Sequence, residues 1–148
     1  MGNLATLKKW EKVFETDFDY ISLEIKKTID APALIFLEGP LGAGKTTFAK
    51  HFLKSHEGEV FSPTYSLINE IGPYVHADFY RLKNSEEIIH LELEYYFENK
   101  KYILIEWGTK YLNDILRYVD ENYSIYQLAI EIQKDYRNLK LSKLDQNK

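Results

Sequence analysis

The sequence predicts an α/β fold: a three-layer sandwich around a mixed, mainly parallel central sheet, with an antiparallel hairpin at the C-terminus. Residues 33–37 and 102–105 are continuous apolar runs, typical of strands buried on both faces between layers of helices. Residues 126–133 alternate between apolar and polar, which indicates a half-buried strand. A turn near 134–135 then returns the chain along 137–141. Parallel strands and an antiparallel hairpin commonly share one sheet in larger α/β proteins.

The chain has 148 residues, the length of a single domain. We expect one domain over 1–148, with an ordered core over about 13–141 and a polar, mobile tail over 142–148. Hydrophobic residues make up 45% of the chain, which is enough for a buried core. The sequence contains no cysteine, which excludes disulfides, thiolate zinc sites and cysteine nucleophiles and suits a reducing compartment.

Charge and hydropathy limit the partners. The net charge is −4, which argues against a large nucleic-acid-binding surface, normally basic. No apolar stretch approaches the about 20 residues that cross a bilayer, and residues 1–12 lack the apolar core of a signal peptide. We therefore expect a cytoplasmic protein that does not contact a membrane.

The first elements are a short strand and a helix. Residues 13–15 predict the strand, and Thr16 is a candidate helix cap, with Asp19 completing a capping-box-like start. The sequence 31–32, Ala-Pro, ends the helix. Its apolar residues form one stripe: Phe18, Ile21, Ile25 and Ile29.

Shorter elements follow in the middle of the chain. Two strands are predicted, over 65–70 and 74–78, with a turn at 72–73 between them. A short helix is expected from Asn84, because acidic residues follow it in the first turn. Residues 111–116 have the spacing of one or two helical turns.

The strand at 33–37 leads into residues 39–46, which read Gly-Pro-Leu-Gly-Ala-Gly-Lys-Thr and fit the phosphate-binding loop pattern G-x-x-x-x-G-K-[ST]. After Lys45, apolar residues recur at helical spacing, and the helix is expected to stop near Gly58. Strand, glycine-rich loop and helix is the arrangement that the motif requires. A glycine-rich turn before an ordinary helix is the alternative, but chance matches rarely have both flanking elements. The sequence therefore predicts nucleotide binding.

Each part of the loop has a predicted role. Glycines allow the backbone N–H groups to point at an anion, and the helix N-terminus adds partial positive charge. Lys45 is expected to reach the β- and γ-phosphates, and the Thr46 hydroxyl to bind Mg2+. Pro40 has no N–H and contributes none. The predicted nucleotide-binding residues of the loop are Gly39, Leu41, Gly42, Ala43, Gly44, Lys45, Thr46 and Thr47.

A phosphate-binding loop needs an acidic residue at the end of a nearby strand to help hold Mg2+. Glu106 directly follows the apolar run 102–105, and Asp78 ends the weaker strand 74–78. The pattern favours Glu106, and solvated carboxylates at strand ends are the alternative for both. For Trp107 the pattern slightly favours core packing over a place at the mouth of the site.

Two further polar residues, Thr64 and His76, have less specific signals in the sequence. Thr64 is a candidate hydroxyl that senses the γ-phosphate, with an ordinary turn as the alternative. His76 has no partner identifiable from spacing, which favours a structural role.

Four segments together, 39–47, 62–65 (Ser-Pro-Thr-Tyr), 76–82 (His-Ala-Asp-Phe-Tyr-Arg-Leu) and 105–107 (Ile-Glu-Trp), resemble the bacterial TsaE (YjeE) family. These are small P-loop ATPases required for the tRNA N6-threonylcarbamoyladenosine modification. The resemblance covers residues 13–141. This chain departs from the family pattern at Pro40, where the family often has Asp, and in the detail of the 76–81 segment. Neither difference changes a group that the chemistry needs.

The resemblance implies roles for the residues at the phosphates. Lys45 and the loop amides would hold ATP or ADP, and Thr46 and Glu106 would bind Mg2+. Asp78 would share the Mg2+ site or activate the attacking water, and with Tyr80 and Arg81 it would form a switch-II-like segment. Thr64 would belong to a switch-I-like loop. Trp107 would belong to the family's Glu-Trp signature and have a functional role in the catalytic site.

By the same resemblance, Glu15, Thr16 and Arg137 would flank the nucleotide base. The family's partners would be the TsaD–TsaB heterodimer, with tRNA reached only through that complex. The expected activity is a Mg2+-dependent ATPase that is slow alone, because the sequence positions no arginine finger and a partner can complete the site.

Other functions remain open. A small P-loop kinase phosphorylating a small molecule would need an Arg-bearing lid, and the chain has only three scattered arginines. A GTPase would need an Asn-Lys-x-Asp motif after a strand, which the segment 99–102 lacks. A nucleotide-gated binding module with incidental hydrolysis would carry the same loop.

Overall fold

The computed structural model describes residues 3–54 and 67–145. Within these ranges, seven strands form one sheet in the order β1-β7-β6-β2-β5-β4-β3. The strands are β1 (Asn3–Val13), β2 (Ala33–Glu38), β3 (Ile68–Ile71), β4 (Tyr74–Asp78), β5 (Tyr102–Glu106), β6 (Ser124–Ile132) and β7 (Arg137–Asp145). The helices are α1 (Phe18–Thr28), α2 (Lys45–Leu53), α3 (Glu86–Ile89), α4 (Leu93–Phe97) and α5 (Leu112–Leu116), with 3-10 turns η1 (Glu15–Asp17) and η2 (Thr109–Tyr111).

The centre of the sheet is parallel. β2 pairs in parallel with β5 on one side and β6 on the other, and β5 pairs in parallel with β4. β7 and β1 extend the sheet antiparallel beyond β6, and β3 pairs antiparallel with β4 at the opposite edge. The predicted mainly parallel core and C-terminal hairpin are confirmed.

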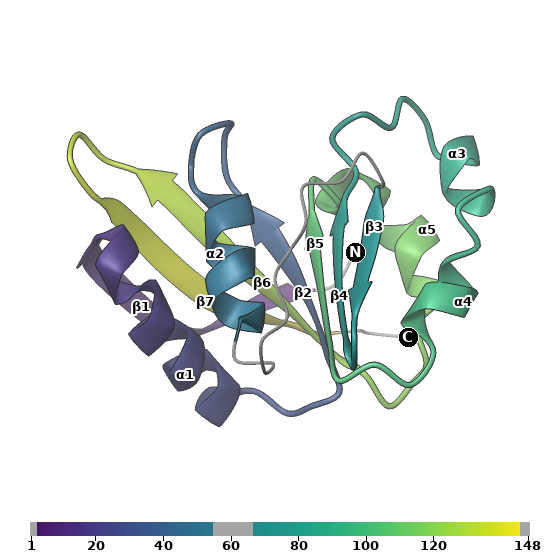
Figure 1. Ribbon diagram of the computed structural model, residues 1–148, viewed down its shortest axis with the longest axis horizontal. Coiled ribbons are helices and arrows are strands. Elements are labelled where there is room, and N and C mark those ends of the chain that lie inside the picture. The colour runs from purple at the N-terminus through teal and green to yellow at the C-terminus, as the bar shows by residue number, and fades with distance from the viewer. Residues whose placement is uncertain (1–2, 55–66, 146–148) are drawn as a thin grey trace.

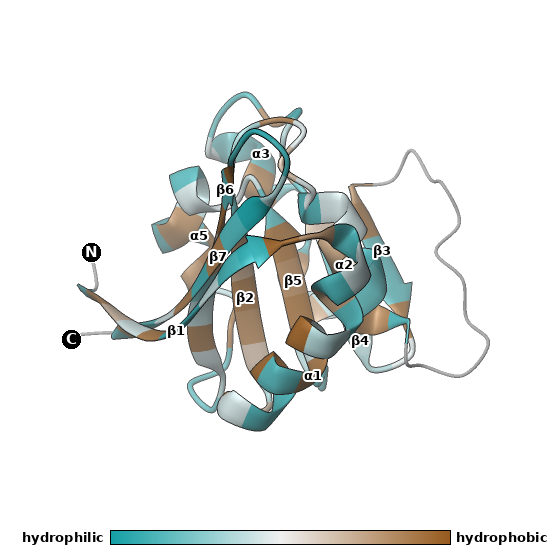
Figure 2. Ribbon diagram, turned by 90° about the vertical axis from the view of Figure 1, so that its left-hand side faces the viewer, coloured by the Kyte–Doolittle hydropathy of each residue, from teal (hydrophilic) through white to brown (hydrophobic). Residues whose placement is uncertain are grey.

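Helices cover both faces of the sheet, which confirms the three layers (Figure 1). α1 and α2 pack on one face, where Ile35 and Leu37 of β2 join their core cluster. Leu34 and Phe36 of the same strand face the cluster beneath α3, α4 and α5. β2 is therefore apolar on both faces, as a continuous hydrophobic run predicts, and Figure 2 shows β2 and β5 as hydrophobic strands at the centre.

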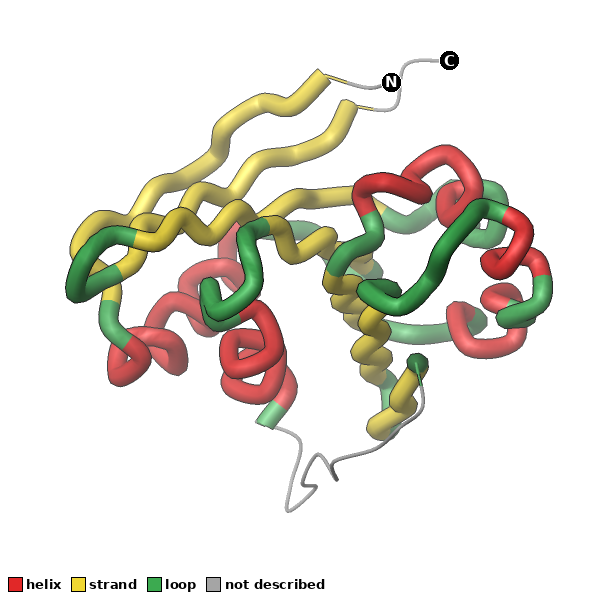
Figure 3. The backbone as a smooth tube through the Cα atoms, turned by 90° about the horizontal axis from the view of Figure 1, so that it is seen from above, coloured by secondary structure: helices red, strands yellow, loops and turns green. Residues whose placement is uncertain are grey.

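The N- and C-terminal strands are longer than predicted. β1 covers Asn3–Val13 instead of 13–15, and β7 continues to Asp145 instead of ending at 141. The two strands run side by side to the two ends of the described chain (Figure 3). The expected core of 13–141 is thus too short, and the expected polar tail over 142–148 is wrong as far as Asp145. Backbone pairing forms these strands, and because β1 is mostly exposed its side chains carry little apolar pattern.

The start of the first helix and the end of the second also differ from the prediction. α1 begins at Phe18, and Asp17 accepts a hydrogen bond from the Phe14 amide at 2.9 Å, so Thr16 is not the cap. Asp19 turns instead toward α2, where it bonds His51 Nδ1 at 2.7 Å and Lys54 Nζ at 2.6 Å. α2 ends at Leu53 rather than near Gly58.

The middle of the chain follows the prediction with small changes. β4 has the predicted bounds, and β3 begins at Ile68; residues 65 and 66 of the predicted strand lie outside the described residues. α4 was not predicted. Within the described ranges, none of the helices has the length and apolar character needed to cross a bilayer.

Candidate functional site

The glycine-rich loop connects the end of β2 to the start of α2, at the carboxyl edge of the parallel strands. Gly42 and Gly44 have φ angles of +81° and +106°, a region that favours glycine. Gly39 is needed for space, because a Cβ atom there would lie 2.7 Å from the carbonyl oxygen of Ile130 in β6. The loop therefore lies in close contact with β6 at its start, and its backbone has left-handed φ angles at Gly42 and Gly44.

Lys45 extends back along this loop. Its Nζ donates hydrogen bonds to the carbonyl oxygens of Gly39 and of Pro40, the latter at 3.0 Å, and lies 4.1 Å from the centre of the Trp107 ring. Burial lowers the pKa of Lys45, while Glu106 and other nearby carboxylates oppose that shift. The ammonium group is thus a partly desolvated cation at the centre of the loop, where an anion gains most from it.

Thr46 and Glu106 meet although they lie 60 residues apart. The Thr46 hydroxyl lies 2.7 Å and 2.9 Å from the two carboxylate oxygens of Glu106, to which it donates. Glu106 is the last residue of β5 and only 2% exposed. The parallel register of β2 and β5 brings the loop and this carboxylate to the same edge of the sheet.

Asp78 stands directly beside Glu106 in the register of β4 and β5. Its Oδ1 accepts a hydrogen bond from the Tyr80 amide at 3.0 Å. Burial raises the pKa of Asp78, and the neighbouring Glu106 charge raises it further, against the lowering effects of the Tyr80 amide, His76 and Lys45. Two adjacent carboxyl groups with different environments are a common feature of metal and catalytic sites.

The loop and these acids enclose a cavity of about 320 Å³. Its lining combines the loop with the ends of β4 and β5: Leu41, Gly42, Ala43, Gly44, Lys45, Thr46, Thr47, Asp78, Tyr80, Glu106 and Trp107. Most predicted residues of the phosphate site therefore line one cavity. Gly39 does not line it, although its carbonyl oxygen accepts a hydrogen bond from Lys45. Thr64 lies outside the described residues.

Trp107 belongs to this cavity and not to a core cluster. Its φ is +58°, which is rare for a bulky residue and stores strain. The ring contacts Tyr80, with centroids 4.9 Å apart, and covers the Lys45 ammonium. The core packing that the pattern slightly favoured is wrong, because the chain turns sharply after Glu106.

His76 has a site partner that spacing did not identify. Its Nε2 lies 2.6 Å from Glu106 Oε2, and its side chain is buried. The available signal was strand periodicity: His76 and Asp78 are two residues apart on β4 and share one face of the sheet. The Glu106 carboxylate is thus held by Thr46 on one side and by His76 on the other.

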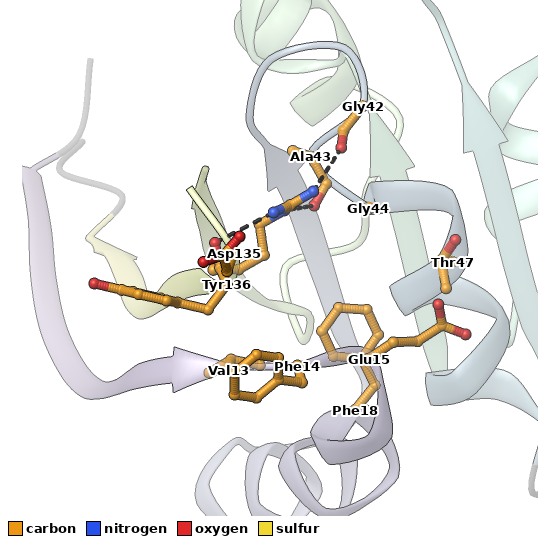
Figure 4. Close-up of a pocket in the computed structure, with 11 residues that line it drawn as sticks. Val13, Phe14, Glu15, Phe18, Gly42, Ala43, Gly44, Thr47, Asp135 and Tyr136 are labelled. Carbon is orange, nitrogen blue, oxygen red and sulfur yellow. Dashed lines mark hydrogen bonds between the residues drawn. The ribbon is translucent and has the colours of Figure 1, made fainter. Parts of the chain in front are cut away.

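A second cavity, also of about 320 Å³, lies on the other side of the loop. Figure 4 shows Phe14 and Phe18 at one wall and Gly42 and Ala43 at another. The two cavities share Gly42, Ala43, Gly44 and Thr47. Of the three residues expected near a base, Glu15 and Arg137 line this cavity, with Tyr136 beside them, and Thr16 does not.

The donor set of the first cavity fits Mg2+. Glu106 and Asp78 supply carboxylate oxygens and Thr46 a hydroxyl, the hard ligands that Mg2+ prefers. In residues 3–54 and 67–145, no three His, Cys, Asp or Glu side chains form a group that could cage a metal. Mg2+ does not need such a cage, because it is usually bound by one or two carboxylates together with phosphates and water.

Comparisons with known proteins place the chain in a family. The sequence model of a family described as "Threonylcarbamoyl adenosine biosynthesis protein TsaE" matches residues 14–140. A TsaE protein of Nostoc sp. is 35% identical over 136 residues, which cover 78% of this chain and 83% of that protein. A TsaE protein of Haemophilus influenzae is 36% identical over 97 residues, 62% of this chain and 61% of that protein.

The fold is also shared with a solved structure. The crystal structure of YdiB from Bacillus subtilis superposes with a TM-score of 0.65, covering 98% of this chain and 90% of that chain. Their sequences are 24% identical, so this likeness concerns the fold alone.

Proposed function

The chain belongs to the TsaE family of threonylcarbamoyladenosine biosynthesis proteins, and we propose that it binds ATP with Mg2+ and hydrolyses it slowly. Its role would be to support the modification of tRNA by acting on the TsaD–TsaB complex. A cytoplasmic location fits a chain without cysteine.

The contact between Thr46 and Glu106 carries the proposal. It places a hydroxyl from the start of α2 and a carboxylate from the end of β5 within 2.9 Å of each other, beside the Lys45 ammonium. A P-loop site requires this combination for the metal and the β- and γ-phosphates. Mg2+, when bound, shields phosphate charge and aligns the terminal phosphate.

The protein's own residues would then act on the phosphates. Lys45 would exchange its carbonyl partners for phosphate oxygens, and the loop amides would take the remaining ones. His76 would keep the Glu106 carboxylate in position. Asp78, beside Glu106, would complete the Mg2+ site or orient the attacking water.

The base would enter the second cavity. Because the two cavities share Gly42, Ala43, Gly44 and Thr47, a nucleotide can place its phosphates in one and its base in the other. The aromatic side chains of Phe14 and Phe18 offer apolar surface for an adenine ring. Glu15 and Arg137 lie at the same cavity.

The composition of the phosphate cavity lining supports slow hydrolysis. No arginine is among the described residues that form it. In P-loop enzymes an arginine finger stabilises the transition-state charge and is worth about 10³–10⁵ in rate. The TsaD–TsaB complex would supply the missing stabilisation or respond to the nucleotide state through loops that order around the γ-phosphate.

Calorimetry in Mg2+ buffer tests nucleotide binding. The parent chain and Lys50→Ala, which removes an exposed lysine from the same helix, should bind ATP equally. Lys45→Ala should bind at least about tenfold more weakly, because a charged hydrogen-bonding group is lost. No ATP uptake by the folded parent chain would refute the proposal.

Cells that carry variant chains test the pathway. Lys45→Ala should reduce tRNA threonylcarbamoyladenosine. Glu106→Ala should retain part of its nucleotide binding and lose the modification if turnover matters. Normal modification with Glu106→Ala would instead support a binding module without functional hydrolysis.

A further inference from the structure

Arg137, at the start of β7, donates two hydrogen bonds to the phosphate loop. Its Nε donates to the carbonyl oxygen of Ala43 at 3.0 Å, and its Nη2 donates to that of Gly42 at 3.2 Å. Its Nη1 donates to the carbonyl oxygen of Tyr136 at 3.2 Å. The guanidinium thus links the C-terminal hairpin to a loop 94 residues earlier in the chain.

These contacts set the direction of two peptide units. In a planar trans peptide the C=O and N–H groups point in opposite directions. The carbonyl of Ala43 points at Arg137, so the N–H of Gly44 points away from it. The carbonyl of Gly42 does the same, and the N–H of Ala43 closes the turn onto the Pro40 carbonyl at 3.1 Å.

The same hairpin supports the other end of the loop. The Ile130 carbonyl of β6 lies so close to Gly39 that a Cβ atom would be 2.7 Å from it. β6 and β7 pair directly beside these contacts, with Ile130 opposite Leu139 and Ile132 opposite Arg137. The β6–β7 hairpin therefore touches the loop at its first glycine and again at residues 42 and 43.

We propose that Arg137 is a positioning residue: it holds the carbonyls of Gly42 and Ala43 outward, so that the Gly44 amide stays turned toward the phosphates and the Ala43 amide stays in the turn onto the Pro40 carbonyl. This inference rests on the proposed nucleotide binding and deepens it. It gives Arg137 a different task from contact with the base. If Arg137 holds the loop, its loss weakens the binding of every ligand with a phosphate chain. If it contacts the base, its loss weakens the binding only of ligands that contain a base.

The test uses Arg137→Met, which keeps an unbranched apolar stem and removes the guanidinium. Lys140→Met is the matched control, because it removes one positive charge from an exposed position on the same strand. Affinities for ATP and for inorganic tripolyphosphate are measured in Mg2+ buffer. We expect Arg137→Met to weaken both by the same factor, about tenfold, and Lys140→Met to change neither. Arg137→Lys, which keeps the charge but not the fork, should recover part of the loss.

Amide hydrogen exchange without nucleotide provides the second readout. Exchange at residues 42–46 should be faster in Arg137→Met than in the parent chain, and unchanged in Lys140→Met, while strand amides of β2 and β5 keep their protection. Unchanged exchange at the loop would overturn the inference. A loss confined to ATP, with tripolyphosphate binding intact, would also overturn it and assign Arg137 to the base.

The two proposals fail in different ways. If the parent chain binds no ATP, the proposed function fails, and the exchange experiment still reports whether Arg137 holds the loop. If the parent chain binds ATP and the Arg137→Met loop exchanges normally, only the positioning role is lost.

Discussion

Hydrogen bonds with two side chains fix the position of the Glu106 carboxylate. Thr46 and His76 bond the same carboxylate from two different elements, at distances of 2.6 to 2.9 Å. A buried carboxylate with defined partners has few orientations available, and a side chain that bonds a metal-binding carboxylate in this way fixes its direction. The consequence is that substitutions at His76 should act on Mg2+ binding without removing any ligand.

We predict that His76→Gln and His76→Leu differ in this respect. Gln keeps a donor N–H that can reach Glu106, whereas Leu leaves the carboxylate without it. The Mg2+ concentration needed for half-maximal ATP binding should rise about tenfold in His76→Leu and little in His76→Gln. Calorimetric titration with ATP at several Mg2+ concentrations measures it, and equal values for the two variants would show that His76 only fills space.

The raised pKa of Asp78 predicts how the stability of the fold depends on pH. Because burial raises its pKa in the folded state, ionising Asp78 costs the folded protein free energy. Stability is therefore lost as the pH rises from the unfolded-state value of about 4 through the raised pKa. Asp78→Asn removes that cost and keeps an oxygen for the Tyr80 amide.

At pH 7 we expect Asp78→Asn to be more stable than the parent chain by about 0.5–2 kcal/mol and to hydrolyse ATP more slowly. The stability difference should shrink as the pH falls through the raised pKa toward 4, because the carboxyl then becomes protonated in the folded state and about half protonated in the unfolded state. Urea unfolding between pH 4 and pH 8 gives the comparison. A difference that stays constant with pH would mean that the charge of Asp78 is not its source.

At the scale of elements, the loop depends on how closely β6 approaches it. Gly39 lacks space beside the Ile130 carbonyl and also has a φ of +156°, whereas Gly42 has open space and a φ of +81°. A backbone carbonyl cannot move aside as a flexible side chain can. The two positions should therefore respond differently to alanine.

We predict that Gly39→Ala is the more harmful substitution. It should destabilise the fold by about 1–3 kcal/mol through overpacking and should displace the loop, so that ATP binding weakens more than tenfold. Gly42→Ala should cost about 1–2 kcal/mol from its left-handed backbone. Thermal unfolding and calorimetry on both variants measure these effects, and equal ATP affinities would contradict the role assigned to β6.

At the scale of the whole molecule, the sheet is completed by its N-terminal strand. β1 lies at the edge and covers β7, and Trp10 packs against the core cluster under α1 while its Nε1 donates to Glu24 at 2.7 Å. Lys8 bonds the other oxygen of Glu24, also at 2.7 Å. The strand thus connects the hairpin that supports the loop to the first helix.

A chain that starts at Val13 tests this arrangement. The sequence alone predicts that such a chain retains the ordered core, whereas the structure predicts the loss of seven of the eight β1–β7 residue pairs and an exposed β7 edge. We expect a melting temperature lower by several degrees and a tendency to associate. A melting temperature equal to that of the full chain, by calorimetry at the same concentration, would contradict it.

Much of the site was predictable because its signals are local. Lys45 and Thr46 are part of one motif, and Glu106 follows an unbroken apolar run, so each is recognisable from a few neighbours. The contact of His76 with Glu106 and that of Arg137 with the loop were not, because they join residues 30 and 94 positions apart. The role of Thr64 lies outside the described residues and stays a prediction.

By itself the sequence determined the parallel core, the phosphate loop and the acids at the strand ends. Hydrophobic burial on both faces of a strand and the φ angles that glycine allows are properties of short segments. Only the tertiary structure decided that β1 is a full strand, that the helix after it begins at Phe18, and that Arg137 bonds the loop rather than standing free at the base cavity. Backbone pairing and backbone carbonyls make these contacts, and they leave no mark on the pattern of side chains.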